Sequence, residues 1–124
     1  MKISFIDSGV LIAAARGAPE KLAKARAVLA DRESIFASSS YVCLEVLPKA
    51  SFYGQEKEHL FYRKFFEAVR FWAPSDETLV QDALEVALQS GLSALDALHV
   101  ASALAVGADE LITSEKSSKL APLC

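Results

Sequence analysis

The sequence predicts a three-layer α/β/α protein, in which a central parallel sheet of four to five strands is covered by helices on both faces. The main observation is that short β-rich apolar segments alternate with longer helical patterns. A hydrophobic content of 52% with 23% charged residues is typical of globular proteins. We expect residues 1–124 to form a single domain without a membrane-spanning segment.

The first elements are a strand and two helices. Lys2–Ile6 is short, apolar and bounded by polar residues, so we expect a buried strand with Asp7 at its carboxyl end. A helix over Val10–Ala15 follows. Pro19 suits the first position of a second helix, which extends from Glu20 to about Asp31.

The middle of the chain continues this alternation. Ile35–Ala37 is a second strand in this prediction, and the serines after it can cap a helix over Tyr41–Leu47, which Pro48 is expected to disturb. The segment from Gln55 to about Glu67 is helical and rich in aromatic residues. Val69–Ala73 fits either the end of that helix or a third strand.

The last third contains the most apolar helix. Acidic residues and a cap favour a helix from Thr78 to about Gln89. Gly91–Gly107 is then almost entirely apolar, with Ser93 in position to cap it. Glu110–Thr113 is a further short strand, whereas Lys116–Cys124 has no clear pattern.

Asp96 is the anomaly in that apolar helix. If the helix is buried, an ionised Asp needs a cation, a metal or several hydrogen-bond donors, because burying a lone charge costs several kcal/mol or more. The alternative is local, since Ser93 and Asp96 have capping-box spacing and Asp96 could simply stabilise the helix start.

Three further carboxylates stand out in the sequence. Asp7 and Glu115 each follow a strand, and Glu45 lies in an otherwise apolar helix, with an ion pair to Lys49 as its structural alternative. In parallel sheets, ligands bind outside the carboxyl ends of the strands. If the fold brings these acids together, their repulsion requires a divalent cation, and carboxylate oxygens suit Mg²⁺ or Mn²⁺.

Charge and cysteine content exclude several classes of protein. A net charge of −3 excludes binding of nucleic acid by bulk electrostatics, so a phosphate partner needs a local basic patch or a bound cation. Cys43 and Cys124 are too few for a disulfide framework and lack zinc-site spacing. The N-terminus does not have the pattern of a signal peptide, so we expect a cytoplasmic protein.

The chain contains Phe-Ile-Asp-Ser at residues 5–8, Glu45 in an apolar helix, Leu-Ser-Ala-Leu-Asp-Ala-Leu-His-Val-Ala-Ser-Ala at 92–103 and Leu-Ile-Thr-Ser-Glu at 111–115. Together these segments resemble the PIN domain family, particularly the VapC-type toxins, from Lys2 to about Leu120. The motif at 92–103 is the most specific. The resemblance implies a sheet with its first strand near the middle, a final edge strand that is short or missing here, and an acidic, metal-dependent pocket that cleaves RNA.

Site residues follow from the resemblance by position. Asp7, Glu45 and Asp96 would be the core catalytic and metal-binding carboxylates, and Glu115 stands where the family usually has Asp. Supporting roles would belong to Ser8 and Thr113. Lys49 and Lys116 are the first candidates for contacts to RNA phosphates. We expect His99 to be a hydrogen-bonded structural residue, with metal ligation as its alternative.

The resemblance also implies partners, and two other functions are alternatives to the nuclease. VapC-type toxins typically form homodimers and bind a small antitoxin, and the aromatic-rich region from Phe52 to Phe71 offers apolar surface for such contacts. One rival is a catalytically weakened PIN-like module that binds RNA or protein. Another is a phosphotransfer or receiver-like domain, which an Asp after the first strand would suit, although Gly9 stands where the dehalogenase-type pattern requires a second Asp.

Overall fold

The computed structural model describes residues 1–114 and 117–119 and contains a sheet of strand order β3-β2-β1-β4-β5. The strands are Lys2–Ile6 (β1), Ser34–Ser38 (β2), Phe71–Trp72 (β3), Glu110–Ile112 (β4) and Ser117–Lys119 (β5). β1 to β4 pair in parallel, and β5 is a short antiparallel edge strand beside β4. The predicted parallel sheet is therefore confirmed.

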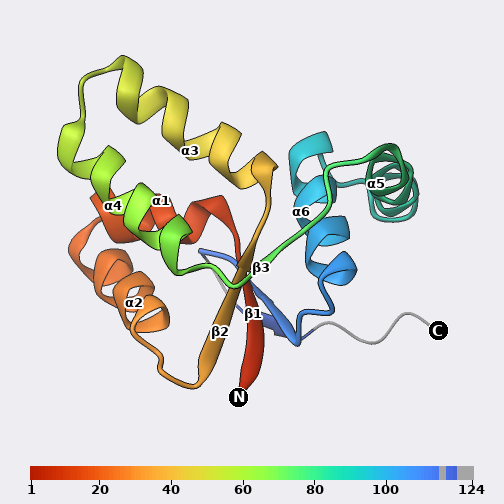
Figure 1. The fold of residues 1–124 in the computed structure, drawn as a ribbon, viewed down its shortest axis with the longest axis horizontal. Helices are drawn as coiled ribbons and strands as arrows, with labels where there is room; N and C mark the ends of the chain where they lie inside the picture. The colour runs from red at the N-terminus through yellow and green to blue at the C-terminus, as the bar shows by residue number, and fades with distance from the viewer. Residues whose placement is uncertain (115–116, 120–124) are drawn as a thin grey trace.

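Helices cover both faces of this sheet. They are Ser8–Arg16 (α1), Pro19–Leu29 (α2), Ser40–Phe52 (α3), Glu56–Ala68 (α4), Glu77–Ser90 (α5) and Ala94–Ala105 (α6). Figure 1 shows α1 to α4 on one side of the sheet and α5 and α6 on the other. The three layers expected from the alternating pattern are therefore present.

The strand order places a topological switch point between β1 and β4. From β1 the chain winds outward to β2 and β3, then returns across the other face through α5 and α6 to pair β4 on the opposite side of β1. As a result, α1, which follows β1, and α6, which precedes β4, lie on opposite faces of the sheet. Such a point forms a crevice in open α/β sheets, and Asp7 and Thr113 follow these two strands.

The structure decides one open alternative and changes one prediction. Of the two possibilities for Val69–Ala73, the strand is present, as β3, and α4 ends at Ala68. The helix predicted over Tyr41–Leu47 continues through Pro48 to Phe52, so its predicted end before Pro48 was wrong. Proline removes the hydrogen bond to the carbonyl four residues earlier, which belongs to Leu44. Leu44 is 68% exposed, and water can therefore solvate that carbonyl.

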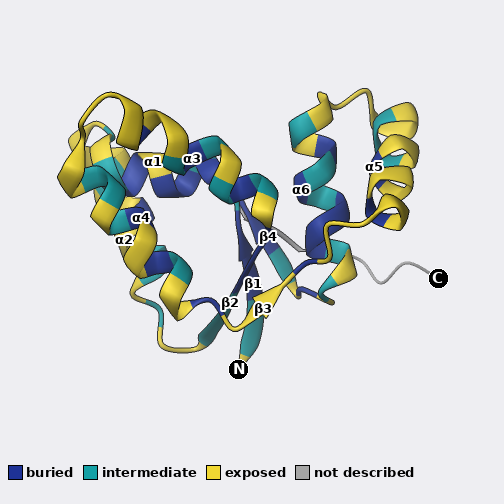
Figure 2. Ribbon diagram, turned by 45° about the horizontal axis from the view of Figure 1, so that its top comes forward, coloured by how far each residue is buried: buried dark blue, intermediate teal, exposed yellow. Residues whose placement is uncertain are grey.

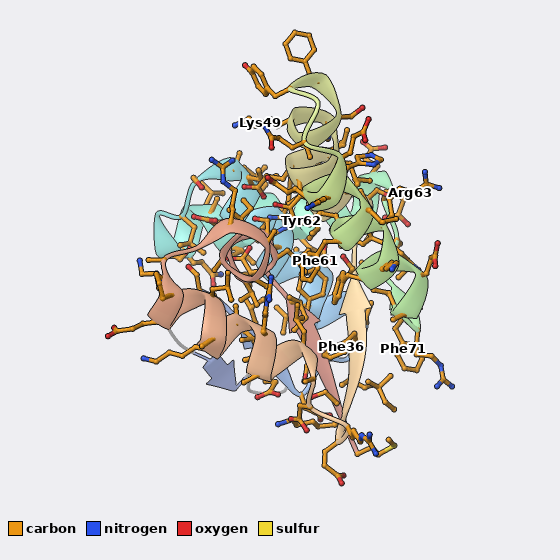
Figure 3. The ribbon with its side chains drawn as sticks, turned by 90° about the vertical axis from the view of Figure 1, so that its left-hand side faces the viewer. Phe36, Lys49, Phe61, Tyr62, Arg63 and Phe71 are labelled. Atoms are coloured by element: carbon orange, nitrogen blue, oxygen red, sulfur yellow. The ribbon has the colours of Figure 1, made fainter. Side chains whose placement is uncertain are left out.

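The core lies mainly between the sheet and the α1–α4 layer. Phe5, Leu11 and Tyr62 are fully buried there, and Figure 2 shows the buried residues concentrated along the central strands and the helix faces turned toward them. The Tyr62 hydroxyl donates to Glu58 Oε2 at 2.6 Å, which satisfies its polar atom. In Figure 3 the side chain of Phe61 lies close to Tyr62, whereas Arg63 points away from α4.

The opposite layer packs through small residues. Ala97 and Ala101 of α6 form a second buried cluster with Leu79 and Ala83 of α5. Small side chains allow α6 to lie close to its neighbours, which brings His99 against the sheet. No helix within residues 1–114 is both long and apolar enough to cross a membrane.

Candidate functional site

Asp7 stands at the centre of the crevice between β1 and β4. It is the N-cap of α1, and its Oδ1 accepts the backbone N–H of Ser8 at 2.8 Å. Its own backbone N–H donates to the Ile112 carbonyl at 3.0 Å, which ties the end of β1 to the end of β4. The sequence positions this carboxylate because a short polar residue after a strand is a favourable helix cap.

Glu45 reaches the same crevice from helix α3. Its Oε1 accepts the Ser8 hydroxyl at 2.6 Å and pairs with His99 Nε2 at 2.8 Å. The Ser8 hydroxyl also lies 3.4 Å from Asp7 Oδ1, so it connects the two carboxylates. No ion pair between Glu45 and Lys49 is present in the described part of the chain, and the contacts of Glu45 instead lead into the site.

His99 is a buried imidazole that contacts both of these carboxylates. Its side chain is 3% exposed, and Nε2 faces both Glu45 Oε1 and, at 3.7 Å, Asp7 Oδ1. Its Nδ1 is buried with no hydrogen-bond partner among the described residues. The contact with the Glu45 carboxylate requires a proton on Nε2, which donates to Oε1.

Asp96 approaches from the other side, on helix α6. Of the two settings considered for it, the structure shows the local one, because the residue is exposed in the first turn of the helix. The Ser93 hydroxyl oxygen accepts the Asp96 backbone N–H at 3.4 Å, which is one half of a capping box. The Asp96 side chain nevertheless lines a pocket of about 330 Å³ together with Asp7 and His99.

The electrostatics of the cluster are those of crowded acids. Burial raises the pKa of the Asp7 carboxyl above its ordinary value, and the charges of Glu45 and Asp96 raise it further. His99 and the Ser8 backbone N–H oppose this effect by lowering the pKa. The effect of burial is larger than that of these stabilising contacts. The fold therefore compensates the charge of ionised Asp7 only in part.

The rim of the pocket is formed by Thr113 and Ser114, which follow β4. Gly9 lies close to this rim, since a Cβ atom at Gly9 would lie 3.0 Å from Ser114 Oγ. The sequence predicted a role for Thr113 but missed Ser114. Only the strand order, which brings β4 beside β1, reveals that Ser114 packs against the start of α1.

The donor set of Asp7, Glu45 and Asp96 fits a hard divalent cation in its chemistry. Carboxylate oxygens are the ligands that Mg²⁺ and Mn²⁺ prefer, and a cation would relieve the repulsion that raises the pKa of Asp7. As the side chains lie, Glu45 is turned toward Ser8 and His99, and no group of three or more Asp, Glu, His or Cys residues among the described residues is placed to hold a metal ion.

The remaining predicted residues are placed as follows. Lys49 lies one turn beyond Glu45 and lines a different pocket with Arg16 and Glu58. Figure 3 shows Lys49 near the C-terminal end of α3. Glu115 and Lys116 lie outside the described residues.

Comparison with known proteins agrees with this arrangement. No curated protein sequence gives a significant match to the chain. A chain in the crystal structure of VapBC2 from Rickettsia felis, bound to a DNA fragment from their promoter, is similar in fold, with a TM-score of 0.66, 20% sequence identity, and coverage of 90% of this chain and 86% of that one. The family model of the PIN domain matches residues 4–120. The chain therefore belongs to the PIN domain family.

Proposed function

We propose that this protein is a divalent-metal-dependent ribonuclease that hydrolyses RNA phosphodiester bonds. The observation that carries the proposal is that Asp7 and Asp96 line one pocket at the switch point of the sheet, and that Ser8 and His99 link Glu45 to Asp7. PIN domains are generally nucleases and generally use divalent metals, which supports the same activity. In this proposal Glu115 is a fourth metal ligand, and Ser8 and Thr113 are supporting groups.

Each residue of the cluster has a separate task in this mechanism. The bound cation would lower the pKa of the attacking water and balance charge on the phosphate. Asp7 or Asp96 accepts the proton that the water loses as its oxygen attacks phosphorus. The P–O bond to the leaving oxygen then breaks, and that oxygen takes up a proton from solvent. His99 and Ser8 hold Glu45 in place through its Oε1 atom. Their hydrogen bonds fix the carboxylate before substrate arrives.

The biological role that we propose is that of a VapC-type toxin in the cytoplasm, controlled by a small antitoxin and active as a homodimer. The likeness in fold to a chain of the VapBC2 complex supports an antitoxin partner. Exposed apolar side chains also support protein contacts, because Phe52 is 82% and Tyr53 69% exposed at the end of α3.

The proposal is tested by metal-dependent RNA cleavage. Chelator-treated protein should leave a labelled single-stranded RNA intact, and added Mg²⁺ or Mn²⁺ should restore cleavage. The metal should also raise the melting temperature of the protein, because it binds the folded state. Saturable Mn²⁺ binding without RNA turnover would instead favour the catalytically weakened module.

His99→Gln should separate positioning from packing. Glutamine keeps an N–H donor for Glu45, whereas His99→Leu keeps bulk but leaves the carboxylate without that donor. We expect His99→Leu to lower Mn²⁺ affinity and cleavage by about 10- to 100-fold, and the glutamine variant to recover most of both. Calorimetric Mn²⁺ titration and cleavage assays measure this. Equal losses in both variants would show that the imidazole acts only through packing.

A further inference from the structure

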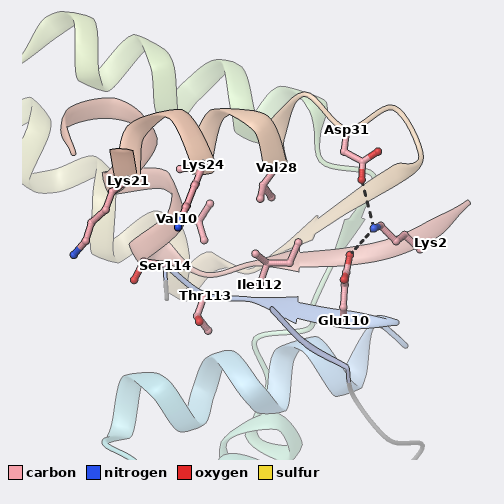
Figure 4. Close-up of a pocket in the computed structure, with 11 residues that line it drawn as sticks. Lys2, Val10, Lys21, Lys24, Val28, Asp31, Glu110, Ile112, Thr113 and Ser114 are labelled. Atoms are coloured by element: carbon pink, nitrogen blue, oxygen red, sulfur yellow. Dashed lines mark ion pairs between the residues drawn. The ribbon is translucent and has the colours of Figure 1, made fainter. Parts of the chain in front are cut away.

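A second pocket adjoins the acidic one across its rim. It has a volume of about 290 Å³ and lies between helix α2 and the β1–β4 part of the sheet (Figure 4). Thr113 and Ser114 line both pockets, so the two hollows meet at the end of β4. Val10 and Val28 contribute apolar surface to the second pocket.

The charges in this second pocket are unevenly distributed. At one end, Lys2 is paired with Asp31 at 3.4 Å and with Glu110 at 3.2 Å. At the other end, Lys21 and Lys24 extend from α2 beside Ser114 (Figure 4). Neither of these two lysines forms an ion pair with a carboxylate in the described part of the chain. The uncompensated positive charge therefore lies at the end nearest the acidic pocket.

Helix geometry places the ammonium groups of Lys21 and Lys24 close to each other. Lys21 and Lys24 are three residues apart on α2, so they project from the same face of the helix. Both residues are exposed at the mouth of the pocket, while Ala25 on the same helix is buried. The pair is a local basic patch on a chain whose net charge is −3.

We propose that Lys21 and Lys24 bind backbone phosphates of the RNA strand that flank the phosphodiester held at the acidic pocket, with the strand crossing the Thr113–Ser114 rim; this inference rests on the proposed ribonuclease function. An acidic pocket repels a polyanion, so the strand requires positive charge close by to be held there. Phosphate contacts of this kind fix the position of a strand without reading its sequence. Lys49 serves less well, since it lines neither the acidic pocket nor the pocket that adjoins it.

The test measures RNA binding separately from cleavage. The full chain with Asp7→Asn keeps the RNA intact, and fluorescence anisotropy with a short labelled single-stranded RNA is recorded in constant Mg²⁺ over a range of KCl concentrations. Adding K21Q/K24Q should weaken binding by about tenfold and reduce the slope of log affinity against log salt by about 1.4, or about 0.7 for each phosphate that a lysine no longer neutralises. K21R/K24R should keep both values near those of the parent.

The matched control is K57Q/K64Q on α4, which removes the same charge from exposed lysines that line neither pocket. It should leave the affinity and the salt slope nearly unchanged. Equal losses in both double variants would overturn the proposal, as would unchanged binding in K21Q/K24Q or no RNA binding by the parent. Inorganic phosphate that binds the lysine pair without competing with RNA would identify a free-anion site and overturn it as well.

The ribonuclease proposal fails in a different way. For this comparison Asp7 is left unchanged. If the wild-type protein and K21Q/K24Q cleave RNA at equal rates, the proposed phosphate contacts of the two lysines are refuted and the nuclease function stands. If the wild-type protein never cleaves RNA but K21Q/K24Q still weakens RNA binding, the ribonuclease proposal is refuted and the phosphate contacts of the two lysines stand.

Discussion

Asp7→Asn is expected to abolish RNA cleavage and, at the same time, to raise the melting temperature of the metal-free protein. The loss of activity should reach about a thousandfold or more, because the variant loses a charged ligand at the centre of the cluster. The helix cap should survive, since Asn caps helices as well as Asp and can accept the Ser8 N–H.

The gain in stability follows from the raised pKa of Asp7. A carboxyl group with a raised pKa in the folded state favours folding when protonated, so its contribution is complete below the ordinary value of 3.8 and is lost as the pH rises through the raised pKa. At neutral pH the wild-type protein therefore carries the cost of ionised Asp7, and the Asn variant does not. We expect a rise of a few degrees in melting temperature.

Thermal unfolding across pH, with and without Mn²⁺, measures this effect. The advantage of the variant should be largest at neutral pH in chelator and disappear in acid, and Mn²⁺ should stabilise only the wild-type protein. Asp82→Asn removes the same charge from an exposed position on α5 and should change neither cleavage nor the melting temperature. A less stable Asp7→Asn variant that still cleaves RNA would contradict the electrostatic account of the site.

The elements that the sequence predicts well are those in which local signals agree. Apolar β-rich residues at Lys2–Ile6 and the cap at Ser93 correspond to β1 and to the start of α6. Pro48 misleads because its cost depends on whether the Leu44 carbonyl meets water, and this depends on tertiary packing. The arrangement of β1 between β2 and β4 depends on contacts between distant segments, which periodicity does not report.

In the acidic site, too, some features have a local signal in the sequence and others depend on contacts between distant residues. Asp7 and Glu45 could be singled out because a carboxylate in an apolar setting is unusual in any sequence. The hydrogen bonds from Ser8 and His99 to Glu45 join residues 37 and 54 positions apart, so no local pattern contains them. Lys21 and Lys24 were not singled out, since lysines on an exposed helix face are common and only their place beside Ser114 distinguishes them.

Asp96→Asn should decide between the two roles open to Asp96. If this residue only stabilises the helix start, the substitution costs no more than about 1 kcal/mol of unfolding free energy, which is the scale of a first-turn acid at a helix N-terminus. If it is a metal ligand, cleavage should also fall by about a hundredfold or more. We expect both effects, because Asp96 lines the same pocket as Asp7 and its charge raises the pKa of Asp7.

Glu77→Gln provides the comparison, since Glu77 is an exposed acid in the first turn of α5 that lines neither the acidic pocket nor its neighbour. Both variants lose one negative charge near a helix N-terminus, so denaturant unfolding should report similar small losses of stability. Cleavage and Mn²⁺ affinity should fall in Asp96→Asn alone. Equal stability losses with unchanged cleavage in both variants would make Asp96 a helix-start residue, and Asp7 and Glu45 alone would then have to hold the cation.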